Sequence, residues 1–207
     1  MIKIENVETY GWEAAIRGMR NPKNSWNKSD SHWWESSNLF KVGDNDLKLM
    51  KALAGAGTDH GKFMRMITVT LDVTAPLYWW KEFDTYKVGT VADSCSTMHK
   101  IAAKEFTLDD FSHEKLHDAF RADLKRLVEL LNIARYKFLE TKDKRFWWDM
   151  IQLLPSSYNQ KRTVQLNYAV LKNMYHARKN HKLDEWLDFC KWVESLPYSE
   201  LITEVMK

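Results

Sequence analysis

Glycine and proline are scarce in this chain, and their scarcity limits the folds that it can adopt. Only 7 glycines and 4 prolines occur among its 207 residues. Because these two residue types interrupt regular secondary structure, their rarity predicts long elements, most of them helices. Segment 112–140 carries apolar residues at spacings of four and three, which is typical of an amphipathic helix. The chain is therefore predicted to be dominated by helices.

A small sheet is predicted beside these helices. Apolar residues occupy positions 2, 4 and 7, and alternation over 63–73 is the clearest strand signal. A short strand is also expected at 163–166, and loops at 21–38 and 89–97. Further helices are predicted over 11–20, 44–56, 144–154, 167–179 and 183–196, and another starts at Pro76. The predicted fold class is α+β, a helix-rich domain with a small central sheet, with residues 1–207 forming one domain.

Charge, hydropathy and cysteine content exclude several classes of protein. The chain has 31 basic and 28 acidic residues, and this net charge of +3 is too small to indicate a nucleic-acid polymer as partner. No apolar run approaches the roughly 18 residues of a membrane span, and the first residues lack the apolar region of a signal peptide. Cys95 and Cys190 are the only cysteines, so no disulfide framework is expected. We therefore expect a cytoplasmic protein without a membrane partner.

Three of the ten tryptophans lie in a polar segment, 21–38, whose Asn and Ser content is typical of a loop. These are Trp26, Trp33 and Trp34. Since aromatic side chains are mostly buried, the favoured interpretation is that the three rings fold back onto the core. The alternative is that they line a pocket or a subunit contact.

One short motif fits a zinc hydrolase. His113, Glu114 and His117 match the H-E-x-x-H pattern, which on a helix places both imidazoles on one face and the carboxylate as a general base. No pattern supports a third ligand, and the motif falls in the first turn of the predicted helix, after Ser112. The favoured interpretation is a solvated helix start, and no metal site is predicted. The zinc hydrolase is retained as the less favoured alternative.

Two segments of the chain resemble the flavin-dependent thymidylate synthase family. Residues 53–98 match a helix, Gly-His, a strand ending near Ala-Pro, a helix with an Arg-His-Arg signature and a Ser-x-Arg loop, in order and without a gap. Residues 154–178 resemble the Leu-Pro, short strand, Asn, helix and Arg that follow in the family. Together the segments cover about a third of the chain. The resemblance implies the mixed α/β fold of that family, assembled as a homotetramer with active sites at subunit contacts.

The resemblance also assigns site residues by position. His60 falls on the histidine of the Gly-His pair, which contacts the flavin and nucleotide region, and Tyr86 and Lys87 fall on the last two residues of the Arg-His-Arg signature. Asn167 matches an asparagine on the flavin side. The predicted cofactor-binding residues are therefore His60, Tyr86, Lys87 and Asn167, and the predicted substrate-binding residues are Cys95, near the substrate, and Arg178, which holds the nucleotide.

The chain departs from the family pattern at several of its arginines. Thr85 stands at the first arginine of the signature, Thr97 at the arginine of Ser-x-Arg, and Ala169 at an arginine two residues after the matched asparagine. Arginine binds phosphate through a planar, bidentate fork that threonine cannot replace. Each such loss is expected to cost roughly 2–4 kcal/mol of binding free energy.

Other residues could compensate for these losses. Lys161, Arg162 and Arg178 are basic residues that could partly do so. A flavin also needs an aromatic or apolar wall for its ring system, which Trp79, Trp80 and Tyr86 could supply.

In the family, FAD is reduced by NADPH and relays a one-carbon unit from methylenetetrahydrofolate to dUMP, which yields dTMP. The resemblance therefore implies a FAD-dependent methyltransferase of dTMP biosynthesis that binds a pyrimidine nucleotide, and it assigns no catalytic residue in this chain. The second hypothesis is a catalytically inactive binding or structural homologue on the same scaffold, because a fold does not carry a function by itself.

Overall fold

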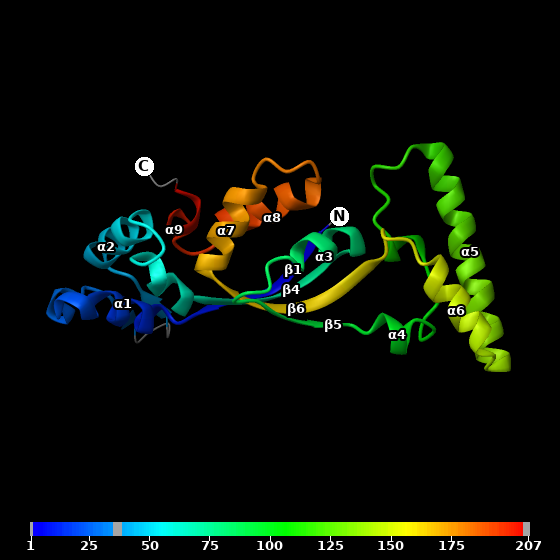
Figure 1. Cartoon of the computed structure of the whole chain (residues 1–207), viewed down its shortest axis with the longest axis horizontal. Coiled ribbons are helices and arrows are strands. Elements are labelled where there is room, and N and C mark those ends of the chain that lie inside the picture. The colour runs from blue at the N-terminus through cyan, green and yellow to red at the C-terminus, as the bar shows by residue number, and fades with distance from the viewer. Residues whose placement is uncertain (1, 35–38, 205–207) are drawn as a thin grey trace. The chain divides into compact units, whose positions relative to one another are not determined.

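The computed structural model describes residues 2–34 and 39–204 of the chain (Figure 1). Its helices are α1 (Trp12–Arg20), α2 (Asp44–Gly55), α3 (Leu77–Phe83), α4 (Thr97–Lys100), α5 (Asp118–Thr141), α6 (Lys144–Leu153), α7 (Tyr168–Arg178), α8 (Asp184–Glu194) and α9 (Glu200–Thr203). Its strands are β1 (Lys3–Tyr10), β2 (His32–Trp34), β3 (Leu39–Lys41), β4 (Thr68–Pro76), β5 (Val91–Ser94) and β6 (Asn159–Asn167). Four short 3₁₀ helices are η1 (Asn21–Lys23), η2 (Trp26–Lys28), η3 (Gly61–Met66) and η4 (Leu108–Asp110). The prediction of a helix-rich α+β fold is confirmed.

Four of the strands form one sheet, in the order β1-β4-β6-β5. Along β4 every second side chain is buried, from Val69 through Leu71 and Val73 to Ala75, as alternation in a strand requires. Strands β2 and β3 form a separate antiparallel hairpin in which Trp33 pairs with Phe40.

The chain forms two compact units. Unit 1 consists of Met1–Ile4, Asp72–Thr85 and Ala92–Thr163, and unit 2 of Glu5–Leu71, Tyr86–Val91 and Val164–Lys207. Strands β4 and β6 have residues in both units, because the chain passes from one unit to the other within them.

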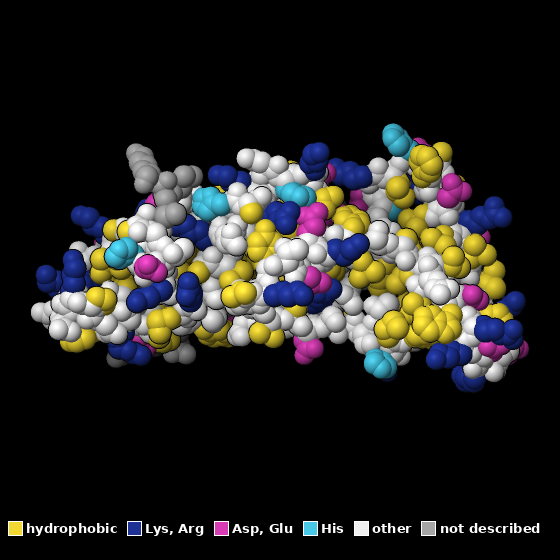
Figure 2. Space-filling view, viewed as in Figure 1, with side chains coloured by type: hydrophobic (Ala, Val, Ile, Leu, Met, Phe, Trp, Pro, Cys, Tyr) yellow, Lys and Arg dark blue, Asp and Glu magenta, His cyan; other side chains and the backbone are white. Residues whose placement is uncertain are grey.

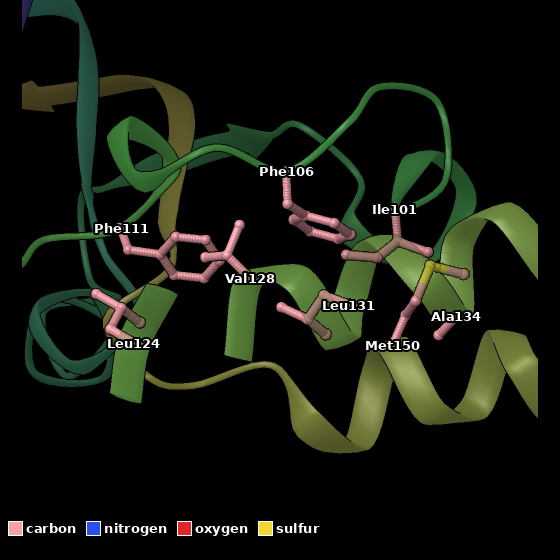
Figure 3. Packing of buried hydrophobic residues seen from close by; sticks show 8 residues of the cluster. All are labelled: Ile101, Phe106, Phe111, Leu124, Val128, Leu131, Ala134 and Met150. Carbon is pink, nitrogen blue, oxygen red and sulfur yellow. The ribbon is translucent and has the colours of Figure 1, made fainter. Parts of the chain in front are cut away.

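The core of unit 1 lies along α5. Leu124, Val128 and Leu131, spaced by four and three residues, are buried against Met150 of α6 and against aromatic side chains of the preceding loop (Figure 3). Asn132 secures that loop, because its amide oxygen accepts a hydrogen bond from the Phe106 backbone N–H at 2.9 Å and its amide nitrogen donates to the Phe106 carbonyl at 2.9 Å.

The core of unit 2 lies around α7, which packs against α8, α9 and η3. Tyr168, at the start of α7, is fully buried and meets the Trp12 ring edge-on at 5.2 Å between centroids. Its hydroxyl donates to the Pro197 carbonyl at 2.6 Å, which supplies the partner that a buried phenol needs. Burial raises the pKa of Tyr168 far above its ordinary value.

Several of the predicted element boundaries are wrong, and the loop expected at 21–38 contains η1, η2 and β2. The strand expected at 63–73 starts at Thr68, because the consecutive residues Phe63 and Met64 are both buried in η3, an arrangement that a strand with one buried face does not allow. The loop expected at 89–97 contains β5 and the start of α4. The long helix begins at Asp118 rather than 112, and Phe120, one of the apolar residues spaced by four and three, is exposed.

The favoured interpretation of the tryptophan-rich segment is also wrong. Trp26, Trp33 and Trp34 have 50%, 52% and 50% of their surface exposed, so the three rings do not fold into the core. Trp26 and Trp33 instead line a pocket, as the alternative interpretation stated. Residues 35–38 of the predicted loop lie outside the described residues. Among the helices of the described ranges, none is long and apolar enough to cross a membrane.

Candidate functional site

Arg178 and Tyr86, which come from the two segments that resemble the family, are in contact within unit 2. The Arg178 Nε donates a hydrogen bond to the Tyr86 hydroxyl oxygen at 2.9 Å. The guanidinium carbon also lies 4.9 Å from the centre of the Trp186 ring and 5.5 Å from that of Tyr86. Stacking of a guanidinium on aromatic faces is favourable and fixes its plane. The last residue of α7 therefore presents a half-buried, positioned cation.

Asn167 caps the other end of the same helix. Its side-chain oxygen accepts a hydrogen bond from the Val170 backbone N–H at 3.0 Å, which makes Asn167 the N-cap residue of α7. Residues 86–91 pass close to this cap. Gly89 has φ +78°, and a Cβ atom placed there would lie 3.1 Å from the Asn167 side-chain nitrogen and from Val170. Glycine therefore suits this position both for its backbone conformation and for the space that it leaves.

The remaining predicted cofactor residues of unit 2 are at the surface. Lys87 follows Tyr86 in the same loop and is exposed. His60 is also exposed and directly precedes η3, which packs against α7. The structure thus brings Tyr86 to Arg178 and the 86–91 loop to Asn167, all within unit 2.

Cys95 belongs to unit 1 and sits at the end of β5. Its backbone N–H donates to the Lys161 carbonyl at 3.0 Å, and its carbonyl accepts from the Gln160 side-chain nitrogen at 3.0 Å. The same nitrogen lies 3.2 Å from the Thr97 hydroxyl oxygen. Gln160 therefore connects the two positions that correspond to the Ser-x-Arg loop of the family. The Cys95 side chain itself is exposed.

Two of the three basic residues expected to compensate for the lost arginines, Lys161 and Arg162, are paired with carboxylates in unit 1. Arg162 makes an ion pair with Asp84 at 2.7 Å, while Lys161 pairs with Asp72 at 3.1 Å. The Arg162 guanidinium also stacks 4.2 Å above the Trp80 ring. Both side chains are thus engaged with carboxylates of unit 1.

Two of the three residues expected to form a wall for the flavin ring are in the core. Trp79 and Trp80 have 0% and 1% of their surface exposed, so this expectation is wrong for both. Tyr86 alone of the three is half-buried beside Arg178, where one face could meet a ring.

The helix that the zinc motif requires is absent. His113 and Glu114 precede α5, and His117 is its N-cap residue, so the two imidazoles do not share a helix face. The His113 Nδ1 lies instead 2.8 Å from the Phe111 carbonyl oxygen. Within the described residues, no group of three or more His, Cys, Asp or Glu side chains could hold a metal ion.

Sequence reasoning missed Trp186 as a site residue. Its position on α8 fits the apolar stripe of that helix, and it is fully buried. The hydrophobic pattern marked it only as a core residue. Its contact with the Arg178 guanidinium depends on how α8 packs against α7, and no local sequence signal encodes that packing.

The fold is that of the flavin-dependent thymidylate synthases. The thymidylate synthase ThyX from Helicobacter pylori with FAD and dUMP matches with a TM-score of 0.75 and 16% identity over 99% of both chains. A second structure of that enzyme, also complexed with FAD and dUMP, gives 0.72 and 16% over 99% of this chain and 100% of the other. The UMP/dUMP methylase PolB from Streptomyces cacaoi, bound with 5-Br dUMP, gives 0.64 and 12% over 100% of this chain and 96% of its own.

No family model matches this chain, and no curated protein matches it. At identities of 12–16% the likeness establishes the shared fold, whereas function has to be argued from the residues of the site.

Proposed function

We propose that this chain binds FAD and a pyrimidine nucleotide and is a diverged relative of the flavin-dependent thymidylate synthases. One observation carries the proposal, the hydrogen bond between Arg178 and Tyr86. It joins the two sequence segments in which the resemblance was found, on a fold shared with proteins crystallised with FAD and dUMP. A chance likeness of short motifs would not require the two segments to meet.

Arg178 is proposed to hold the nucleotide. A guanidinium that Tyr86 and Trp186 already orient loses little conformational freedom when it binds an anionic or carbonyl oxygen. On the flavin side, Tyr86 would contribute a ring and Lys87 a positive charge. Asn167 would contribute its side chain, beside which the 86–91 loop passes closely at Gly89. His60 and Cys95 are proposed as further contacts of the flavin and the substrate.

FAD, when bound, would supply the redox chemistry and carry the one-carbon unit, which no side chain can do. The chain's own residues would bind and orient. Transfer to dUMP would consume methylenetetrahydrofolate and NADPH. The inactive binding or structural homologue remains the second hypothesis, because Thr85, Thr97 and Ala169 stand where the family has arginines.

Absorption spectroscopy of the purified chain, followed by titration with FAD and dUMP, tests the proposal. We expect flavin absorption bands and a dUMP affinity that falls about 10- to 100-fold in Arg178→Ala, since hydrogen bonds to charged groups contribute about 1.5–3 kcal/mol. Arg126→Lys, an exposed position on α5, is the control and should leave both affinities unchanged. A protein that binds neither ligand would refute the proposal, while one that binds both without forming dTMP would favour the inactive homologue.

Self-association is proposed as well, in the form of a homotetramer. Along α5 the apolar residues Leu130, Ile133, Tyr136 and Leu139 follow a spacing of three and are each at least 40% exposed. Trp148 of α6 is also exposed. Figure 2 shows hydrophobic side chains gathered over α5 and α6. Exposed apolar patches of this kind mark protein contacts, and a second copy is the occupant that the fold resemblance suggests.

Light scattering coupled to gel filtration tests this assembly. Ile133→Glu places a charge at the middle of the exposed apolar row and should reduce the measured mass to that of smaller species. Val88→Glu, an equally apolar and more exposed position outside α5, should leave the mass unchanged. A wild-type chain that runs as a monomer would contradict the assembly. The cytoplasm remains the proposed location.

A further inference from the structure

Unit 2 contains a pocket of about 300 Å³ that lies apart in sequence from the residues proposed above. Its side chains come from α1, η2 and the β2–β3 hairpin, and they include Glu13, Ile16, Arg17, Trp26, Trp33 and Phe40. The volume lies at the lower end of the range for small-molecule sites, which suits a single fused ring system.

Aromatic rings form the walls of this pocket. Trp33 and Phe40 are directly opposite each other in the hairpin, so their side chains share one face, and their ring centroids lie 5.4 Å apart in an edge-to-face arrangement. The indole N–H of Trp33 donates to Glu13 at 3.1 Å, and that of Trp26 donates to Asn21 at 2.8 Å. Both indole N–H groups therefore have partners within the protein, and both rings are about half exposed.

A buried carboxylate keeps the pocket loop in place. Asp46, which is fully buried, pairs with Arg20 at 2.6 Å and accepts hydrogen bonds from the hydroxyls of Ser29 and Ser31 at 2.6 Å each. Arg20 in turn donates to the carbonyl of Lys28 at 3.0 Å. Because these bonds fix the loop between Trp26 and Trp33, the aromatic faces are positioned before any ligand arrives.

Among the polar side chains that line the pocket are those of Glu13 and Arg17. Glu13 and Arg17 are four residues apart on α1 and therefore lie on the same face. Their closest atoms, Oε1 and a terminal guanidinium nitrogen, are 3.9 Å apart, and both side chains are more than half exposed. Such a long, solvated ion pair contributes little by itself and can separate to bind a ligand.

We propose that this pocket binds a planar heterocycle with an amino group, a ring N–H and a carbonyl on one edge, the 2-amino-4-oxopyrimidine edge shared by guanine and pterins. The amino and ring N–H groups would donate to the two oxygens of Glu13, and the adjacent carbonyl would accept from Arg17. The ring would stack on Trp33 and Trp26. Adenine cannot make this pattern, because its edge offers no second donor to the carboxylate.

The site is distinct from the proposed FAD and nucleotide site and does not depend on it. Calorimetric titration of the full chain with guanosine, inosine and adenosine 5′-monophosphates tests it, since inosine lacks only the 2-amino group. We expect guanosine monophosphate to bind about 10- to 100-fold more tightly than the other two. Folic acid carries the same edge on a pterin. Comparing its affinity with that of guanosine monophosphate shows whether the pocket takes a pterin or a guanine, because the preferred ring system binds more tightly.

Matched variants locate the binding. Glu13→Gln and Trp33→Ala should each weaken the guanosine monophosphate affinity at least tenfold, whereas Glu129→Gln, at an exposed position of unit 1, should leave it unchanged. Arg178→Ala should also have no effect, which separates this site from the proposed nucleotide site. Three results would each overturn the proposal. The first is equal affinity for adenosine monophosphate, and the second is no binding of any of these ligands. The third is binding that Arg178→Ala abolishes and Glu13→Gln leaves intact.

Discussion

Replacing Asp46 with asparagine removes the charge that holds the 25–31 loop onto α1 and α2. The carboxylate has no exposed surface and is the ion-pair partner of Arg20, which is itself only 4% exposed. Removing one partner of a buried ion pair costs about 3–5 kcal/mol, because the other charge stays buried without compensation. At the lower end of that range, the melting temperature of a chain of this size should fall by about 6–12 °C.

Thermal and urea unfolding followed by tryptophan fluorescence measures this loss. Asp44→Asn is the matched control, since Asp44 lies in the same first turn of α2 but is exposed. This substitution removes only the favourable interaction of a negative charge with the helix N-terminus, which contributes about 0.3–1 kcal/mol to the free energy of unfolding. A stability of Asp46→Asn within about 0.5 kcal/mol of wild type would refute the reasoning, because surface substitutions reach that size.

The pH dependence gives a second test of the same group. Burial alone would raise the pKa of Asp46, but hydrogen bonds from Ser29, Ser31 and Arg20 outweigh it and hold the pKa below its ordinary value. A carboxyl with a lowered pKa stabilises the folded state fully above its unfolded pKa of about 3.9 and loses that stabilisation as the pH falls through the folded pKa. The difference between wild type and Asp46→Asn should therefore be constant above about pH 5 and shrink below it.

Three further outcomes are expected. A thiol reagent at neutral pH should modify Cys95 rapidly and Cys190 slowly, because Cys95 is exposed while burial raises the pKa of Cys190 to about 11. Cys95→Ser should remove the fast phase of the reaction. Burial and a hydrogen bond to Glu194 raise the pKa of Tyr175 to about 12. The stability that this protonated hydroxyl contributes is therefore complete below pH 10 and is lost as the pH rises through 12. Tyr175→Phe should reduce this loss of stability at alkaline pH in unfolding experiments. Asn167→Ala should destabilise α7 by about 1 kcal/mol in urea unfolding, and an unchanged midpoint would argue against the cap.

Local chemistry in the sequence determined much of the secondary structure. The amphipathic spacing on α5, the proline before α3 and the asparagine at the start of α7 each act over a few residues, so pattern and capping rules suffice for them. The rules failed where neighbouring elements decide. Phe63 and Met64 begin the 63–73 segment, whose alternation is typical of a strand. They fold instead in a 3₁₀ helix, because η3 packs against α1, α2 and α7 and buries both residues.

The sites were decided by tertiary structure. Tyr86 and Arg178 are 92 positions apart, and the motif order placed both at a site, but their contact and its third member, Trp186, depend on the packing of α7 and α8. The tryptophan-rich segment shows the same limit, because composition favours burial of its rings. The three rings are half exposed, and Asp46 holds the loop between Trp26 and Trp33 through its ion pair with Arg20 and its bonds to Ser29 and Ser31. Sequence periodicity determines which face of an element is apolar, whereas only the assembled elements determine what that face meets.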